Sequence, residues 1–126
     1  VQPREVDALG LTESVRLAMQ RALEQITVPH EKNIVDGNYN FLAHNPKATA
    51  VIKADDTVAA VTAASIVAKV ARDKYMANEA AAHFPAYGFD KHVGYGTALH
   101  AEMLKLHGVC VLHRRSFLPI QAIMAA

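Results

Sequence analysis

The sequence predicts an α/β fold, and three of its features lead to this prediction. Apolar residues between Leu11 and Ile26 recur at helical spacing, and two short apolar runs follow, near residues 33–35 and 48–54. A long Ala-rich run comes next, at residues 57–82. Alternation of helical and strand patterns is typical of helices layered on a sheet. With 126 residues, the chain matches one domain.

Composition excludes several classes of protein. Hydrophobic residues make up 52% of the chain and charged residues 20%, a balance that excludes a disordered tail. No apolar run approaches the roughly 18 residues of a membrane span, so we expect a soluble protein with no membrane partner. Cys110 is the single cysteine, which excludes an intrachain disulfide and a Cys-rich zinc site and fits a cytoplasmic location. The simplest interpretation of Cys110 is a small buried hydrophobic residue.

Charge is distributed unevenly along the chain. Residues 1–60 hold six Lys or Arg against eight Asp or Glu, a net charge of −2, whereas residues 61–126 hold seven against four, a net charge of +3. Five of the seven histidines also lie in the later part. An imbalance of this size does not by itself define a surface that binds a polyanion.

The first predicted helix begins at Leu11 and ends near Pro29. One apolar stripe would run along it, consisting of Leu11, Val15, Ala18, Met19, Ala22 and Ile26. We expect this helix to pack through the stripe and to carry no chemistry.

Each of the two predicted strands ends in acidic residues. Asp36, followed by a glycine, ends the first strand, and Asp55 and Asp56 end the second. Asp-Gly is a common turn pair, and Asp55, Asp56 or Thr57 could cap the long helix that follows. Metal ligation is the other interpretation, because carboxylates at the carboxyl ends of adjacent parallel strands converge where α/β sheets bind ligands. The local sequence leaves both interpretations open.

The long Ala-rich helix has one polar face. Its members recur at helical spacing and are Thr62, Ser65, Lys69, Arg72 and Asp73. This face is either solvated, with Arg72 and Asp73 in salt bridges between helices, or it brings Lys69 or Arg72 to a phosphate beside the acidic strand ends.

The part after Pro85 is rich in glycine and aromatic residues, and a helix at 99–107 and the basic stretch HRRSF at 113–117 follow. In Gly94-Tyr95-Gly96 the glycines would let the backbone approach a ligand, to which Tyr95 offers a ring and a hydroxyl. Simple packing of Tyr95 is the alternative. The histidines of this part form no compact HxxxH or HxH pair, so the spacing does not favour zinc ligation.

Five segments occur in the order, and at about the spacing, found in one enzyme family. They are IVDGN, VIKAD, AASIVAKVARDKYM, GFDKHVGYGT and HRRSF. Through them the chain, from about Glu5 to Pro119, closely resembles the carboxy-terminal two-thirds of ribonuclease HII, a type 2 ribonuclease H. The resemblance implies a ribonuclease H-like fold lacking its first strands. Residues 1–126 would form one partial domain, with a helical substrate-binding part at about 83–126.

The resemblance also implies an activity and its residues. The family cleaves the RNA strand of RNA–DNA hybrids, and single ribonucleotides in duplex DNA, with four carboxylates and divalent Mg²⁺ or Mn²⁺. Asp36 matches the family's VDG aspartate, and Asp55, rather than Asp56, matches its K-[GA]-D aspartate. Both are expected to be catalytic metal ligands. Tyr95 looks like the family tyrosine that stacks near the ribose and senses its 2'-hydroxyl, and Lys69 is a second candidate for substrate binding.

Some of the family pattern is missing. Val93 follows His92 where the family usually has Lys, and Gly108-Val109 stands where Gly-Pro is usual. The family's first strand, with an adjacent Asp-Glu pair and a Gly-Arg-Gly loop, has no counterpart, so two of the four carboxylates are absent. We therefore expect a partial protein that binds metal weakly and cleaves poorly or not at all on its own. A noncatalytic remnant that binds nucleic acid or only folds is the alternative, and no obligate protein partner is expected.

Overall fold

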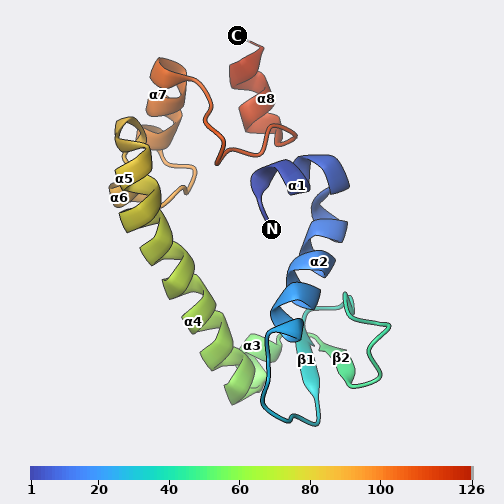
Figure 1. Ribbon diagram of the computed structural model, residues 1–126. Helices are drawn as coiled ribbons and strands as arrows, with labels where there is room; N and C mark the ends of the chain where they lie inside the picture. The colour runs from blue at the N-terminus through green and yellow to red at the C-terminus, as the bar shows by residue number, and fades with distance from the viewer. Residues whose placement is uncertain (126) are drawn as a thin grey trace. The chain divides into compact units, whose positions relative to one another are not determined.

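The computed structural model describes residues 1–125 and confirms a mixed α/β architecture, mostly helical, with one small sheet (Figure 1). The chain forms two compact units, which divide between Ile66 and Val67. Each unit is described by itself below.

The first unit begins with two helices, α1 (Pro3–Leu9) and α2 (Leu11–Glu24). The sequence pattern did not predict α1, although its signals are present. Pro3 stands at the helix start, and the backbone amide of Gln2 donates a 2.7 Å hydrogen bond to the Glu5 carboxylate. The Glu5 carboxylate also pairs with Arg21 on α2 at 2.8 Å, which ties the two helices together.

The α2 helix begins where predicted, at Leu11, but ends at Glu24 rather than near Pro29. The expectation that its apolar stripe packs is largely wrong, because Leu11 is 62% exposed and Ile26 is 49% exposed. Ser14 is instead the buried residue of α2. Helix α2 packs against α1, which spans only Pro3–Leu9, and a helix of seven residues covers only part of one of fourteen.

The sheet consists of two strands, β1 (Asn33–Asp36) and β2 (Ala48–Val51). They are parallel, with Asn33 opposite Ala48 and Asp36 opposite Val51. The predicted second strand, 48–54, is too long. Its last part turns through Lys53, which lies in the left-handed region at φ 53° and ψ 42°, into the short helix α3 (Ala54–Thr57).

Helix α4 (Ala59–Tyr75) carries the chain from the first unit into the second. The predicted cap at Asp55, Asp56 or Thr57 is wrong, because all three residues belong to α3. Val58, in an extended conformation, separates α3 from α4. The predicted helix continues beyond α4 as the π-helical segment η1 (Met76–Ala80) and the short α5 (Ala81–His83).

The second unit holds short helical elements around a small core. They are η2 (Pro85–Tyr87), α6 (Phe89–His92), α7 (Ala98–His107) and α8 (Leu118–Met124). The buried hydrophobic residues of this core are Ala80, Tyr87, Phe89, Leu104 and Ile120, and Cys110 is partly buried against them. The helix predicted at 99–107 is confirmed as α7, with the Thr97 hydroxyl accepting a hydrogen bond from the His100 amide as its cap.

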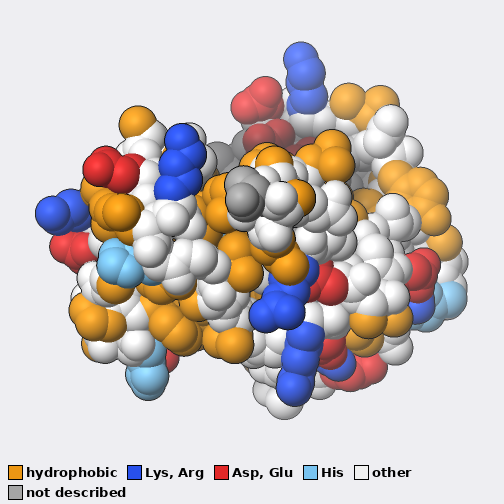
Figure 2. Space-filling model, turned by 90° about the horizontal axis from the view of Figure 1, so that it is seen from above, with side chains coloured by type: hydrophobic (Ala, Val, Ile, Leu, Met, Phe, Trp, Pro, Cys, Tyr) orange, Lys and Arg blue, Asp and Glu red, His pale blue; other side chains and the backbone are white. Residues whose placement is uncertain are grey.

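Hydrophobic side chains also reach the surface. On the face shown in Figure 2 they are widespread among the charged groups. Among the exposed side chains of the chain as a whole, Ile66 and Val67 on α4 are 59% and 68% exposed. Over residues 1–125, no helix combines the length and apolar character needed to cross a membrane.

Candidate functional site

The two predicted metal ligands lie at one end of the two-stranded sheet. Asp36 is the last residue of β1, and Asp55 is in the first turn of α3, just beyond β2. The Asp36 Oδ1 atom accepts a 2.8 Å hydrogen bond from the backbone amide of Ala54, the residue before Asp55. The parallel pairing of β1 and β2 therefore brings the Asp36 carboxylate to the amino-terminal turn of α3.

The same turn is fixed by its backbone. The carbonyl of Lys53 accepts hydrogen bonds from the amides of Asp56 and Thr57, each at 3.2 Å. Ala54 is completely buried, and the Thr62 hydroxyl donates to the carbonyl of Asp55. Asp36 and Asp55 are themselves exposed. A hydrogen-bonded turn with the buried Ala54 at its start thus presents two carboxylates to solvent.

The donor chemistry of these residues suits Mg²⁺ or Mn²⁺, which prefer carboxylate oxygens. Within residues 1–125, however, no group of three or more His, Cys, Asp or Glu side chains is placed to hold a metal ion. Asp36 and Asp55 would therefore supply part of a ligand set, and the remaining ligands would be other groups, substrate oxygens or water.

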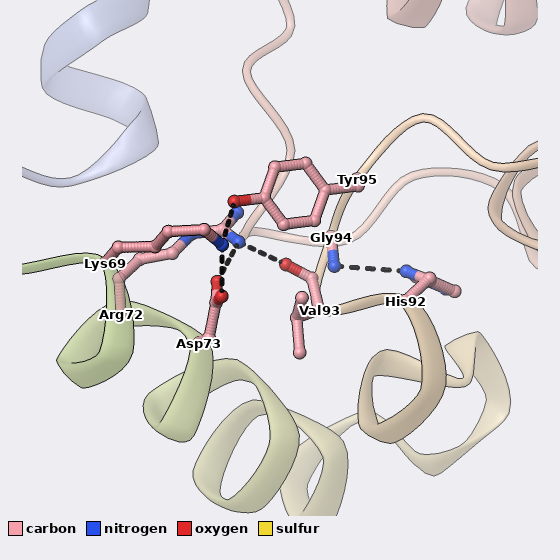
Figure 3. Close-up of polar contacts among 7 residues, drawn as sticks. All are labelled: Lys69, Arg72, Asp73, His92, Val93, Gly94 and Tyr95. Atoms are coloured by element: carbon pink, nitrogen blue, oxygen red, sulfur yellow. Dashed lines mark hydrogen bonds and ion pairs between the residues drawn. The ribbon is translucent and has the colours of Figure 1, made fainter. Parts of the chain in front are cut away.

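Tyr95 lies in the second unit, on the loop between α6 and α7, with its ring against the polar face of α4 (Figure 3). Its hydroxyl accepts a 3.2 Å hydrogen bond from Lys69 Nζ. The Lys69 ammonium lies 5.2 Å and the Arg72 guanidinium carbon 5.0 Å from the ring centroid, within the range of cation–π attraction. Tyr95 is 49% exposed, so it is not a packed core residue.

Asp73 holds the two cations in place. Its carboxylate accepts from Lys69 Nζ at 2.8 Å and from Arg72 Nη1 at 3.1 Å, and Arg72 also donates to the carbonyl of Val93. The hydrogen bond with Asp73 raises the pKa of Lys69, and the hydrogen bond with Lys69 lowers the pKa of Asp73. The salt bridges of this polar face thus lie within α4 and do not join two helices. Lys69 and Arg72 of the same face also contact Tyr95.

The loop that carries Tyr95 has an unusual backbone. Val93 has φ 44° and ψ 33°, in the left-handed region that a β-branched residue rarely adopts. Gly94, at φ 82°, follows it, and a Cβ atom there would lie 3.1 Å from the Met76 side chain and 3.2 Å from that of Arg72. A glycine at position 94 therefore lets the loop approach α4 closely.

Buried histidines support this loop, and the sequence pattern missed them. His92, His100 and His113 are 5%, 7% and 8% exposed, and the rings of His92 and His100 stack at 4.3 Å. Burial lowers the pKa of His100 and of His113. Spacing could not reveal this cluster because its members meet only through the packing of α6, α7 and the segment before α8.

The four predicted site residues fall into two pairs. In the first unit Asp36 is hydrogen-bonded to the backbone of Ala54, the residue before Asp55, and in the second unit Lys69 is hydrogen-bonded to Tyr95 itself. Their catalytic and binding roles stay predictions.

Comparison with known sequences identifies the family. The sequence profile described as Ribonuclease HII matches residues 1–119. Curated relatives named Ribonuclease HII include those of Nitrosospira multiformis, 44% identical over 97% of this chain, and Shewanella amazonensis, 44% identical over 94%. The relative from Neisseria meningitidis serogroup A is 43% identical over 98%. The chain therefore belongs to the ribonuclease HII family.

The match covers only part of each relative. This chain spans 60% of the Nitrosospira protein, 57% of the Shewanella protein and 63% of the Neisseria protein.

Proposed function

We propose that this chain is part of a type 2 ribonuclease H, a cytoplasmic hydrolase acting on RNA–DNA hybrids and on single ribonucleotides embedded in duplex DNA. The observation that carries the proposal is the hydrogen bond from the Ala54 amide to Asp36, which ties the carboxylate that ends β1 to the backbone turn that also carries Asp55. Membership of the family supports it. We also propose that the mixed α/β architecture is a ribonuclease H-like fold, in which β1 and β2 are two strands of the sheet.

Asp36 and Asp55 would hold Mg²⁺ or Mn²⁺ in this proposal. Divalent metal supplies activation of water and neutralisation of charge on the phosphate oxygens during phosphodiester hydrolysis. The residues of this chain contribute position: β1 and the hydrogen-bonded turn at the start of α3, anchored by the buried Ala54, hold the two carboxylates. Rigid support matters because small displacements of ligands and reacting groups lower rates strongly.

Tyr95 and Lys69 would recognise the substrate. Only the 2'-hydroxyl separates a ribonucleotide from a deoxyribonucleotide at one site, so discrimination requires a ring to stack on the sugar and a polar group to contact that hydroxyl. Tyr95 offers both, and Lys69 and Arg72 beside it offer positive charge for the neighbouring phosphates.

The decisive experiment is a cleavage assay on a DNA duplex with one embedded ribonucleotide. It uses the protein expressed from the complete coding region that contains this chain. We expect cleavage in Mg²⁺ or Mn²⁺, and a loss of at least about 100-fold in Asp36→Asn. Asparagine keeps an oxygen that can accept from the Ala54 amide and removes only the charge. Unchanged cleavage by Asp36→Asn would contradict the proposed metal role.

The alternative function is a noncatalytic remnant that binds nucleic acid or only folds. It is favoured by the finding that the described residues supply no complete group of metal ligands. The coding sequence upstream separates the two functions, since a strand ending in Asp-Glu and followed by Gly-Arg-Gly would supply the missing carboxylates. Purified residues 1–126 are expected to cleave poorly, and robust Mg²⁺-dependent cleavage by them would refute that expectation.

A further inference from the structure

A chain of hydrogen bonds joins the Tyr95 loop to the interior of the second unit. Nδ1 of His100 lies 2.9 Å from the carbonyl oxygen of Tyr95, and Nε2 of His100 lies 3.1 Å from Nε2 of His113. The backbone amide of Cys110 donates to Nδ1 of His113 at 3.0 Å. Three separate segments of the chain therefore meet through two imidazole rings.

The chemistry of the end groups fixes the proton on each ring. A carbonyl only accepts, so His100 must carry its proton on Nδ1 and use Nε2 as an acceptor. The Cys110 amide only donates, so His113 must accept at Nδ1 and donate from Nε2. The two assignments agree at the bond between the rings, where one nitrogen donates and the other accepts. This arrangement requires both histidines to be neutral.

We infer that His100 is a positioning residue for Tyr95, because its Nδ1–H holds the Tyr95 backbone carbonyl. His113 in turn donates to Nε2 of His100 and thereby keeps the His100 proton on Nδ1. The inference rests on the proposed function, in which Tyr95 recognises the ribose. It goes further by assigning a role to two histidines buried beneath Tyr95. Neither ring is assigned to the chemistry of cleavage.

The surroundings disfavour a charge on either ring. Both rings are buried, which removes the water that would solvate a charge, and His92 stacks on His100 at 4.3 Å. Burial raises the pKa of the Tyr87 hydroxyl and of the Cys110 thiol, which both lie close to His113, so neither supplies a negative charge near pH 7. Two guanidinium groups, those of Arg72 and Arg114, line the same partly open hollow of about 680 Å³ as the two rings. No carboxylate is among the residues that line this hollow in the described part of the chain.

Protonation would break the hydrogen-bond chain at a defined point. A proton on Nε2 of His100 would face the N–H of His113, and a proton on Nδ1 of His113 would face the amide of Cys110. The folded-state pKa of both histidines is lowered below the ordinary 6.5, so their contribution to stability is complete above about pH 6.5 and declines as the pH falls below it. Recognition by Tyr95 should weaken over the same range.

Two variants of His100 separate positioning from packing. In His100→Asn the side-chain amide nitrogen can replace Nδ1 as the donor to Tyr95, but the side chain does not titrate. In His100→Phe the ring remains and the donor is lost, so the Tyr95 carbonyl keeps only its 2.8 Å hydrogen bond from the Thr97 amide. His107→Asn, an exposed position on the same helix α7, is the matched control.

The first measurement is long-range ¹H–¹⁵N NMR of the histidine rings in the 126-residue chain. We expect the Nδ1–H tautomer for His100 and the Nε2–H tautomer for His113 above pH 7. We also expect the ¹³C chemical shift of the Tyr95 backbone carbonyl to change in His100→Phe but not in His107→Asn. The opposite tautomer at His100, or an unchanged Tyr95 shift in His100→Phe, would overturn the inference.

The second measurement is the ratio of affinities for a duplex with one ribonucleotide and for the same duplex in all-DNA form, from pH 5.5 to 8. We expect His100→Phe to lower the ratio about tenfold at pH 8, the effect of losing one hydrogen bond that holds the Tyr95 backbone. His100→Asn should keep the ratio and lose its dependence on pH. If the parent chain does not prefer the duplex with a ribonucleotide over the all-DNA duplex, the role of Tyr95 in the proposed function is contradicted. The positioning role of His100 is then decided by the NMR measurement. Parent-like pH dependence in His100→Asn would contradict the inference.

Discussion

At the scale of single residues, the proposed metal site depends on which of two adjacent aspartates would be the ligand. Asp55 and Asp56 both lie in the first turn of α3, and both are exposed. The amide bonded to Asp36 belongs to Ala54, the residue directly before Asp55. Asp56 instead lines a shallow surface depression together with Thr57, Thr62 and Ile66. The two side chains are therefore expected to differ in their access to a metal held by Asp36.

This difference leads to a prediction about metal affinity. Binding of Mn²⁺ to the chain, measured by electron paramagnetic resonance, should weaken at least about tenfold in Asp55→Asn, because one of two anionic ligands is removed. Asp56→Asn removes the same charge one residue away and should change the affinity by less than about threefold. Equal losses in both variants would show that net charge, rather than ligation, controls the binding.

Lys53 allows a second prediction at this scale. Its left-handed conformation costs an ordinary residue about 1–2 kcal/mol, whereas glycine adopts it freely. Lys53→Gly should therefore raise the free energy of unfolding by up to about 1 kcal/mol, after the extra entropy of glycine in the unfolded chain is subtracted. The matched control is Lys32→Gly, an exposed position without a positive φ, which should lower the same free energy. Urea denaturation measures both, and a destabilised Lys53→Gly would contradict the argument.

At the scale of helices and strands, the pairing of α1 with α2 has a defined dependence on pH. The hydrogen bond from Arg21, followed by that from the Gln2 amide, lowers the pKa of Glu5 from 4.5 to about 2. Because the folded-state pKa lies below the unfolded one, the contribution of Glu5 is complete above about pH 4.5 and is lost as the pH falls towards 2. Helix α1 should lose order over this range.

Backbone carbon shifts of α1, recorded from pH 5 to 2, test this expectation. The parent should show a decrease in helical shifts, and Glu5→Gln should show reduced helical shifts already at pH 5 with little further change. Glu13→Gln removes a salt bridge that lies within α2 and should leave the titration of α1 unchanged. A parent α1 that stays helical at pH 2 would show that Glu5 does not hold it.

The sequence predicted some of these elements and missed others for identifiable reasons. The helix at 99–107 and two short strands ended by acidic residues were predicted, and the structure has them as α7, β1 and β2. The parallel pairing of the strands was only a condition of the metal interpretation, because strand direction is set by the fold and not by the local pattern. The break between α3 and α4 was not predicted, because Ala-rich periodicity continues through Val58 while the backbone there is extended. The tautomers of His100 and His113 depend on packing between distant segments, which no local pattern encodes.

At the scale of the whole chain, the division into two units separates the predicted metal ligands from the predicted substrate-recognition residues. The first unit presents the carboxylates on a short sheet, and the second presents Tyr95 and Lys69 above a core of aromatic residues and histidines. Helix α4 provides the continuous backbone connection and carries Thr62 in one unit and Lys69 in the other. Damage to the second core should therefore affect recognition before it affects metal binding.

Phe89 tests this separation directly. It is 1% exposed, stacks on Tyr87 at 5.5 Å and contacts the edges of His92 and His100, so Phe89→Ala should lower the free energy of unfolding of the second unit by about 3–5 kcal/mol. Hydrogen exchange should show lost protection in α6 and α7, while the β1 and β2 amides and the affinity for Mn²⁺ stay close to those of the parent. Leu106→Ala, at a position 66% exposed, is the control and should change little. Equal loss of protection in the sheet would show that the two units unfold as one, in which case α4 transmits the damage from one core to the other.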